Sequence, residues 1–274
     1  MLRVAWFFVV SARRRLLFAL GGWFLGGWRY SRHVLAVVTT LALVSVRPRF
    51  WPSTARNIFA RQILQIGVGS ILFILILGGL VGAVAVVQAA GWAQGILQVQ
   101  LLNPLLVVVV ARELGPLFAN LIVFSKDGTS TTSEVGLMKL SGEIRLLEAQ
   151  GIDPLTYFLL PKMCGAAVAS FCLTILFIGV AFLAGFFVGT AIGHINVSLE
   201  HFFSDTLRSL ELVDWVVLVI KSMVPAAIQS VICATHGLQI SSPAGLAGAT
   251  RLAASRSLAA VFTVSTITSL VAYG

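Results

Sequence analysis

Charge is scarce in this sequence. Only 11% of its 274 residues are Asp, Glu, Lys or Arg, and 58% are hydrophobic, whereas a soluble domain carries roughly 25% charged residues. This composition excludes an ordinary soluble enzyme, a disordered chain and a nucleic-acid-binding domain. The net charge of +9 has one source, because residues 1–61 hold ten Arg and no acid. Arg gathered before the first long apolar run marks the cytoplasmic end of a membrane protein.

Catalytic and metal-binding signatures are also missing. The three cysteines fall inside apolar stretches, where Cys behaves as a small hydrophobe, and their odd number gives no disulfide framework. The four His show no metal-ligand spacing. No phosphate loop, G-x-S-x-G or H-E-x-x-H motif occurs. We therefore predict that the chain holds no cofactor or metal of its own, is not an enzyme and does not hydrolyse ATP itself.

Long apolar runs predict five membrane-spanning helices, because a crossing needs roughly 20 mostly apolar residues. Two earlier runs of 13 residues are too short to cross and are flanked by Arg and Trp, as in helices that lie in the membrane interface. We predict an all-α membrane protein, with a basic extension and interfacial helices over residues 1–52 and a five-helix transmembrane domain over residues 53–274. The five predicted spans are Ile63–Gln88, Val99–Phe124, Met163–Ile192, Trp215–Thr235 and Leu252–Ala272; the two short runs are Leu16–Trp28 and Val34–Val46.

The Arg-rich N-terminus predicts the sidedness of the chain. It is placed in the cytoplasm by the positive-inside rule, and the loops then alternate across the membrane. The predicted inside loops are 125–153 and 236–251, and the predicted outside segments are 89–98, 193–214 and the C-terminal Gly274.

The second span contains the adjacent charges Arg112 and Glu113. They lie about 12 residues from either end of the predicted span, roughly 18 Å deep and near the midplane. Charge at that depth is rarely tolerated facing lipid and marks a functional site by default. Pro116 removes the helical hydrogen bond to the Arg112 carbonyl, which favours a cavity over a packed seam. The alternative is that both charges only pair with polar groups on neighbouring helices.

The other polar or small residues of the spans allow two interpretations each. Gly78-Gly-Leu-Val-Gly82 lets another backbone approach closely, either within one protomer or at a dimer seam. Gln88 at the end of the first span contacts a lipid headgroup or caps the helix. Lys221 is expected to extend its ammonium to the membrane interface.

The inside loop predicts a short amphipathic helix at about 134–148, followed by a stop at Gly151–Pro154. Leu140, Ile144 and Leu147 share one face. Such a helix lies on the membrane or inserts into a partner's groove, and the sequence does not decide between the two.

Three motifs resemble those of the MlaE/YrbE permeases. They are Arg112-Glu-Leu-Gly-Pro116, Glu134-Val-Gly-Leu-Met-Lys139 and Glu148-Ala-Gln-Gly-Ile-Asp-Pro154, and the similarity continues over most of residues 55–274. The resemblance implies the homodimeric membrane subunit of an ABC transporter that moves phospholipids between the inner membrane and periplasmic MCE-domain proteins. ATP and Mg²⁺ would bind a separate cytoplasmic ATPase dimer, often accompanied by a STAS-domain protein. The implied location is a bacterial inner membrane.

The resemblance also implies roles for particular residues. The lipid pocket would lie between protomers, and the loop between the second and third spans would dock on the ATPase. We assign lipid binding to Arg112, Glu113, Gln88 and Gly82, and ATPase coupling to Glu134, Lys139, Glu143 and Glu148.

The sequence departs from the family pattern at several positions. Gly142-Glu143 replaces a usual Glu-Gln in the coupling helix, Ser265 replaces an Asp in the last helix, and Ala90 stands where an aromatic is expected. These departures keep two alternatives open: a fatty acid or sterol importer of the same family, and a membrane scaffold that does not transport.

Overall fold

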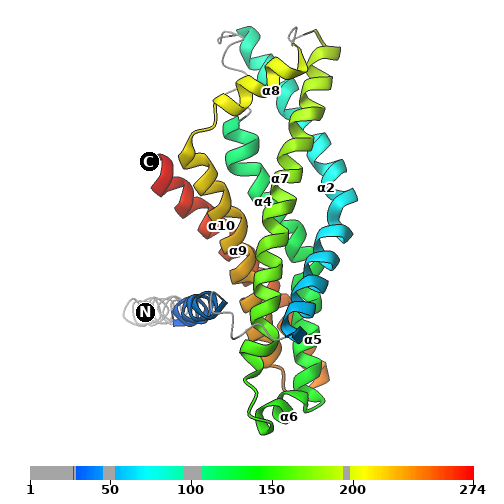
Figure 1. Cartoon of the computed structure of the whole chain (residues 1–274), viewed down its shortest axis with the longest axis vertical. Coiled ribbons are helices and arrows are strands. Elements are labelled where there is room, and N and C mark those ends of the chain that lie inside the picture. Colours follow the sequence, from blue (N-terminus) through cyan, green and yellow to red (C-terminus); the bar gives the residue numbers. More distant parts are fainter. Residues whose placement is uncertain (1–26, 28, 46–52, 96–106, 194–197) are drawn as a thin grey trace, which may run out of the picture.

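The computed structural model describes residues 27, 29–45, 53–95, 107–193 and 198–274. All elements within these residues are helices. The long helices run side by side along the longest axis of the molecule, with α8 near one end and α6 at the other (Figure 1). Their bounds are α2 Ser53–Gly95, α4 Gly115–Val123, α5 Thr129–Leu140, α6 Glu143–Ala149, α7 Leu160–Ala191, α8 Leu199–Arg208, α9 Leu212–Leu238 and α10 Leu246–Tyr273, with π-helical η3 Val107–Leu114, η4 Phe124–Gly128 and η5 Leu155–Leu159 and the 3₁₀ turn η6 Pro243–Gly245.

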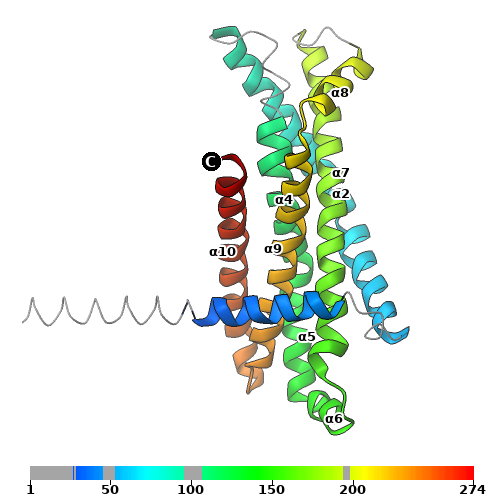
Figure 2. The same cartoon turned by 60° about the vertical axis from the view of Figure 1, so that its left-hand side comes forward.

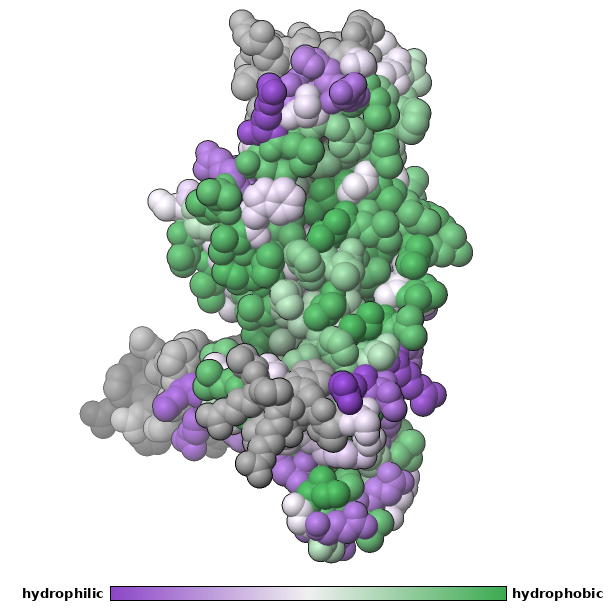
Figure 3. All heavy atoms as spheres, viewed as in Figure 1, coloured by the Kyte–Doolittle hydropathy of each residue, from purple (hydrophilic) through white to green (hydrophobic). Residues whose placement is uncertain are grey.

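Within the described residues, five helical segments are long and apolar enough to cross a membrane, which confirms the predicted fold class. They are Ser53–Gln88, Val108–Leu140, Leu155–Ala191, Leu212–Leu238 and Pro243–Tyr273. Their apolar side chains form a broad belt, with polar residues beyond it toward α6 and toward α8 (Figure 3). The protein is therefore a multi-pass membrane protein.

The helix at residues 29–45 lies across the bundle rather than along it (Figure 2). Its Val34 and Leu41 are buried in a core cluster with Met163 and Val231 of the long helices. This is the arrangement predicted for an interfacial helix over Val34–Val46. The first short run, Leu16–Trp28, lies almost wholly outside the described residues.

Helices α2 and α7 pack most closely at glycines. A Cβ at Gly82 would collide with the backbone of Ala181, and a Cβ on Gly185 would lie 2.7 Å from Val86. The Gly78–Gly82 segment therefore packs within the protomer, which settles the choice left open by the sequence. The contact is close because neither glycine carries a side chain to separate the helices.

The second span and the loop after it differ from the prediction. The span does not end at Phe124 but continues without a break through η4 and α5 to Leu140. The single helix predicted over 134–148 is wrong, because Gly142 adopts a φ of 84° and separates α5 from α6. Only glycine takes this left-handed conformation readily, so the chain turns there.

Polar and charged residues on all five spans mark the α6 end of the apolar belt. From this layer toward the α8 end, α2 crosses the belt with no charged residue from Ile63 to Gln88. The charged or titratable residues that border the belt on the five spans are Arg61, Asp127, Lys162, His236 and Arg256. The interfacial helix contacts this layer through Tyr30, which lies against His236 and Arg256.

Candidate functional site

Arg112 lies where three spans meet, in the π-helical segment η3. Its Nη2 donates a 2.9 Å hydrogen bond to Asp214 Oδ2 in α9, and its Nε lies 2.8 Å from Oδ1. Tyr273, the last residue of α10, donates its hydroxyl to Asp214 Oδ1 at 2.6 Å. The Tyr273 ring also lies under the guanidinium, whose carbon is 4.6 Å from the ring centroid. The second, fourth and fifth spans are thus joined by one ion pair and its tyrosine.

Glu113 faces a different set of partners, as expected for adjacent residues about 100° apart on a helix. Lys221 of α9 donates to Glu113 Oε1 at 2.7 Å, and Ser269 of α10 donates to the same oxygen at 2.8 Å. The expectation that Lys221 extends to the membrane interface is wrong, because its side chain is 0% exposed and ion-paired. A buried ammonium without a partner is strongly unfavourable, and Glu113 supplies the carboxylate that compensates for part of its desolvation.

Lys221 also takes over a backbone role. Its Nζ donates a 2.9 Å hydrogen bond to the Arg112 carbonyl, which Pro116 leaves without the usual helical donor. Asn120 closes the same region by donating to the carbonyls of Pro116 and Lys221 at 2.7 and 2.9 Å. The backbone expected to be partly unsatisfied is therefore satisfied by side chains.

The depth of the site differs from the prediction. Arg112 contacts Asp214 in the first turn of α9 and Tyr273 at the end of α10. Fourteen residues separate it from Lys126, about 21 Å of helix. The pair therefore lies beyond the midplane, toward the α8 end of the spans, rather than near the middle of the membrane.

Two cations and two carboxylates balance in this polar site, which we define as Arg112, Glu113, Asp214 and Lys221. Arg112 pairs with Asp214 and Glu113 pairs with Lys221, as the alternative of pairing with polar groups on neighbouring helices predicted. The Glu113 side chain nevertheless keeps 45% of its surface exposed. An ionised carboxylate that faces hydrocarbon is strongly disfavoured, so this face requires a polar neighbour beyond the residues that the structure describes.

The other two residues assigned to lipid binding lie elsewhere. Gly82 is buried against Ala181 of α7, so the structure does not bring it to the polar site. Gln88 is exposed near the end of the first span. Among the described residues, no side-chain hydrogen bond of Arg112 or Glu113 involves Gly82 or Gln88.

The four residues assigned to coupling divide into two pairs. Glu134 forms an ion pair with Lys162 of α7, and Lys139 donates a 2.6 Å hydrogen bond to the Leu238 carbonyl at the end of α9. These two therefore fasten α5 to the bundle. Glu143 and Glu148 are exposed on α6, the helix at the end of the molecule opposite α8 (Figure 1).

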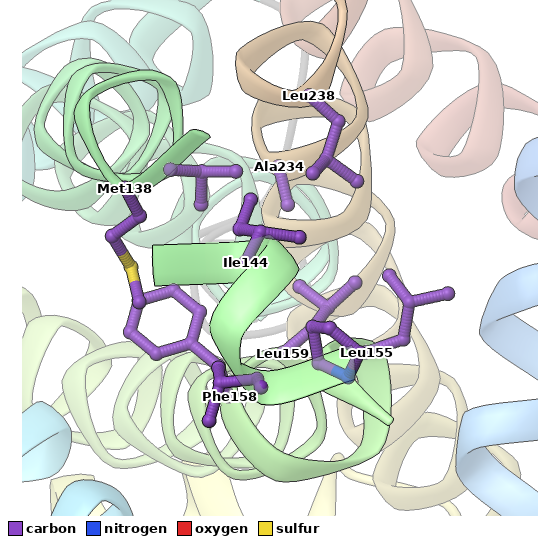
Figure 4. A pocket seen from close by; sticks show the side chains of 10 residues that line it. Met138, Ile144, Leu155, Phe158, Leu159, Ala234 and Leu238 are labelled. Atoms are coloured by element: carbon purple, nitrogen blue, oxygen red, sulfur yellow. The ribbon is translucent and has the colours of Figure 1, made fainter. Parts of the chain in front are cut away.

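The apolar face of α6 covers a small cavity of about 30 Å³ in its own chain. Ile144 points into it together with Met138 of α5 and Phe158 of η5 (Figure 4). The sequence left open a membrane or a partner's groove for this face. In the structure, Ile144 and Leu147 face the bundle, and the surface of α6 left for a partner carries its charges.

Sequence reasoning missed a second polar network at the opposite end of the bundle. Gln62 donates to Asp127 at 2.6 Å, Thr131 donates to the same carboxylate oxygen at 3.0 Å, and Lys162 contacts both Thr131 and Glu134. All four of Gln62, Asp127, Thr131 and Lys162 are at most 6% exposed. The only signal in the sequence was the charged Lys126-Asp127 pair directly after an apolar run.

Comparison with known proteins agrees with this architecture. The model of the family described as Permease MlaE matches residues 59–271. The chain belongs to the MlaE permease family. The match includes both polar networks and all five spans except a few terminal residues.

Several relatives are named as probable permeases of ABC transporters. A "Probable ABC transporter permease protein" of Rickettsia typhi is 26% identical over 204 residues, which cover 74% of this chain and 77% of the relative. The "Intermembrane phospholipid transport system permease protein MlaE" of Haemophilus influenzae is 30% identical over 132 residues, 48% of this chain and 51% of the relative. "Protein TRIGALACTOSYLDIACYLGLYCEROL 1, chloroplastic" of Arabidopsis thaliana is 28% identical over 158 residues, 57% of this chain and 45% of the relative. This chain is thus an ABC transporter permease of the MlaE family.

Proposed function

We propose that this permease moves phospholipids, and that the half-exposed Glu113 beside Arg112 marks where a lipid headgroup passes. The carrying observation is the 45% exposure of a carboxylate within a membrane span. A zwitterionic or anionic headgroup supplies the polar neighbour that such a face requires, whereas hydrocarbon does not. The Haemophilus relative, named for phospholipid transport, supports this lipid class over a fatty acid or a sterol.

The exposed face of α10 supports a lipid pathway between two copies of the chain. Only 17% of the most apolar stretch of this span is buried. Its mean hydropathy of 1.3 is the lowest of the five spans, against 2.8 for α2. Thr263 and Thr266 on this face bond back to carbonyls of their own helix at 2.7 and 2.8 Å. Between these hydroxyls the face exposes large apolar side chains such as Phe262, Ile267 and Leu270, and such a face suits a second helix or a lipid chain. In this proposal a homodimer encloses the lipid between its α10 faces.

The role proposed for Arg112 in lipid binding follows from the contacts of its guanidinium. Its guanidinium already holds Asp214 and the Tyr273 ring, so a lipid phosphate must compete with or displace Asp214 to be bound. Arg offers five donors in a planar fork, enough to hold both during an exchange. Headgroup binding would thereby loosen the junction of the second, fourth and fifth spans, which couples lipid binding to helix movement.

The cytoplasmic projection of α5 and α6 provides the route by which a partner acts on the spans. ATP and Mg²⁺ would bind on a separate ATPase dimer that contacts Glu143 and Glu148. Movement of α5 would reach α7 through Glu134–Lys162 and α9 through Lys139–Leu238. Periplasmic MCE-domain proteins on the α8 side and a STAS-domain protein beside the ATPase complete the assembly implied by the family resemblance. The bacterial inner membrane, with the Arg-rich N-terminus in the cytoplasm, is the location that fits it.

The test is transport by the full complex in proteoliposomes, with labelled phospholipid, fatty acid and sterol offered in separate assays. We expect ATP-dependent movement of phospholipid by the wild type and its loss in Arg112→Ala, with the assembled complex still hydrolysing ATP. Wild-type transport by Arg112→Ala would remove the role of Arg112. Transport of only a fatty acid or sterol would replace the lipid class, and ATP hydrolysis with no lipid moved by the wild type would favour the scaffold.

A further inference from the structure

Arg256 lies at the depth of lipid phosphates on the α6 side of the membrane. It is on α10 thirteen residues before Ser269, about 20 Å of helix away from the polar site. The interfacial helix crosses the bundle at this level (Figure 2), and Tyr30 of that helix contacts Arg256 directly. From Ser257 to Ala272, α10 carries no charged residue. Arg256 therefore stands at the border of the apolar belt.

The Arg256 guanidinium is held in place by Tyr30 and His236, which we call its seat. Its carbon is 4.2 Å from the centroid of the Tyr30 ring, and its Nη1 is 3.3 Å from His236 Nε2. The seat is itself fixed, because the Tyr30 hydroxyl is 3.2 Å from Thr235 Oγ1 and the rings of Tyr30 and His236 are 5.6 Å apart. Stacking on an aromatic face holds a guanidinium in place without using its N–H donors. Most of the donors of Arg256 thus remain for a ligand.

No carboxylate neutralises this Arg among the described residues. The ion pairs found there engage Arg112, Lys162, Lys221 and His201. Arg29 and His33 stand one residue before and three after Tyr30 on the interfacial helix, and Arg32 lies between them. All three are exposed. The corner between the interfacial helix and α10 is consequently cationic, in contrast to the neutral polar site near the other end of the spans.

An apolar strip continues from Arg256 along the exposed face of α10. Ala259, Thr263, Ile267 and Leu270 follow at helical spacing and are all exposed, and the Thr263 hydroxyl is satisfied by the Ala259 carbonyl. An acyl chain can lie along such a strip while its headgroup remains at the cationic corner. A soluble anion would use only the corner.

We propose that Arg256, seated on Tyr30, binds the headgroup of an anionic phospholipid from the cytoplasmic leaflet, about 20 Å of helix from the polar site and at the opposite end of the α10 face along which the proposed lipid pathway runs. The chemistry is a phosphate diester held by a guanidinium, with Arg29 and Arg32 adding attraction for net negative charge. The site does not depend on which lipid the permease transports.

The test is lipid retention by the full-length chain, measured by native mass spectrometry in detergent with equal amounts of phosphatidylglycerol and phosphatidylcholine. We expect the wild type to retain phosphatidylglycerol selectively and Arg256→Gln to retain about tenfold less of it, the change that corresponds to one lost hydrogen bond between charged groups. Arg251→Gln is the matched control, because Arg251 is an exposed Arg on the same end of the same helix. It is expected to retain lipid as the wild type does.

Three results would overturn the proposal. Equal losses in Arg256→Gln and Arg251→Gln would indicate general electrostatics rather than a seated site. Unchanged retention in Arg256→Gln would remove Arg256 from lipid binding. Displacement of the lipid by millimolar inorganic phosphate would assign the corner to a soluble anion.

A further variant tests the seat itself. Tyr30→Leu keeps every charge and removes the aromatic ring under Arg256, and it is expected to lower retention as well. Matching elution volumes and melting temperatures show that each variant is folded.

Discussion

Lys221 donates a hydrogen bond to the carbonyl of Arg112, the group that Pro116 deprives of its helical partner. The same ammonium forms an ion pair with Glu113 at 2.7 Å. One buried side chain of the fourth span thus compensates for a break in the second span and neutralises a carboxylate beside it. The proline, the charge and the lysine form one structural unit, although 108 residues separate Glu113 from Lys221.

Replacing Lys221 with Met should destabilise the protein strongly. The substitution preserves most of the side-chain length but leaves the Arg112 carbonyl without its donor and Glu113 with the Ser269 hydroxyl in place of an ion pair, and breaking a buried ion pair costs about 3–5 kcal/mol. Unfolding by titration with a denaturing detergent measures the change. Lys126→Met is the control, because Lys126 is exposed and should change the free energy of unfolding by less than about 0.5 kcal/mol. Equal effects of the two variants would contradict the proposed unit.

Tyr273→Phe should separate the two contacts that Tyr273 makes. It removes the hydroxyl that donates to Asp214 and keeps the ring under Arg112. A hydrogen bond to a charged group contributes about 1.5–3 kcal/mol, and partial solvent access at the helix end places the expected loss at the low end. Tyr273→Leu, which also removes the ring, should cost more. If the two variants unfold alike, the ring makes no contribution of its own.

Lys162→Met should cost less than Lys221→Met although both lysines are buried. Its partner Glu134 lies seven residues past Asp127, outside the apolar belt, and its exposed carboxylate can be hydrated after the substitution, whereas Glu113 lies within the belt. The expected loss is therefore about 1–3 kcal/mol. Glu134→Gln provides the matching single variant, and the double variant should show a coupling of at least about 0.5 kcal/mol. Purely additive losses would indicate that the two side chains do not interact.

The sequence predicted what depends on local composition and missed what depends on pairing. Apolar runs located the five spans, because crossing the membrane sets a length and a composition that are visible in one segment. Asp214 and Tyr273 carried no such signal, since their importance comes from Arg112, 102 and 161 residues away in the chain. The depth of Arg112 was misjudged for the same reason, because it follows from the contacts of Arg112 with Asp214 in the first turn of α9 and with Tyr273 at the end of α10.

Gly82→Ala tests the close contact between α2 and α7 against a control in the same helix. A Cβ at Gly82 would meet the Ala181 backbone, whereas a Cβ on Gly69 would have nothing within 4 Å. Overpacking against backbone costs about 1–3 kcal/mol or more. Gly69→Ala removes only the conformational cost of a helical glycine and should stabilise the protein by up to about 1 kcal/mol. The two substitutions should therefore shift the detergent midpoint of unfolding in opposite directions. A stabilising Gly82→Ala would mean that α2 and α7 separate without cost, and that Gly82 is free to line a surface other than this interface.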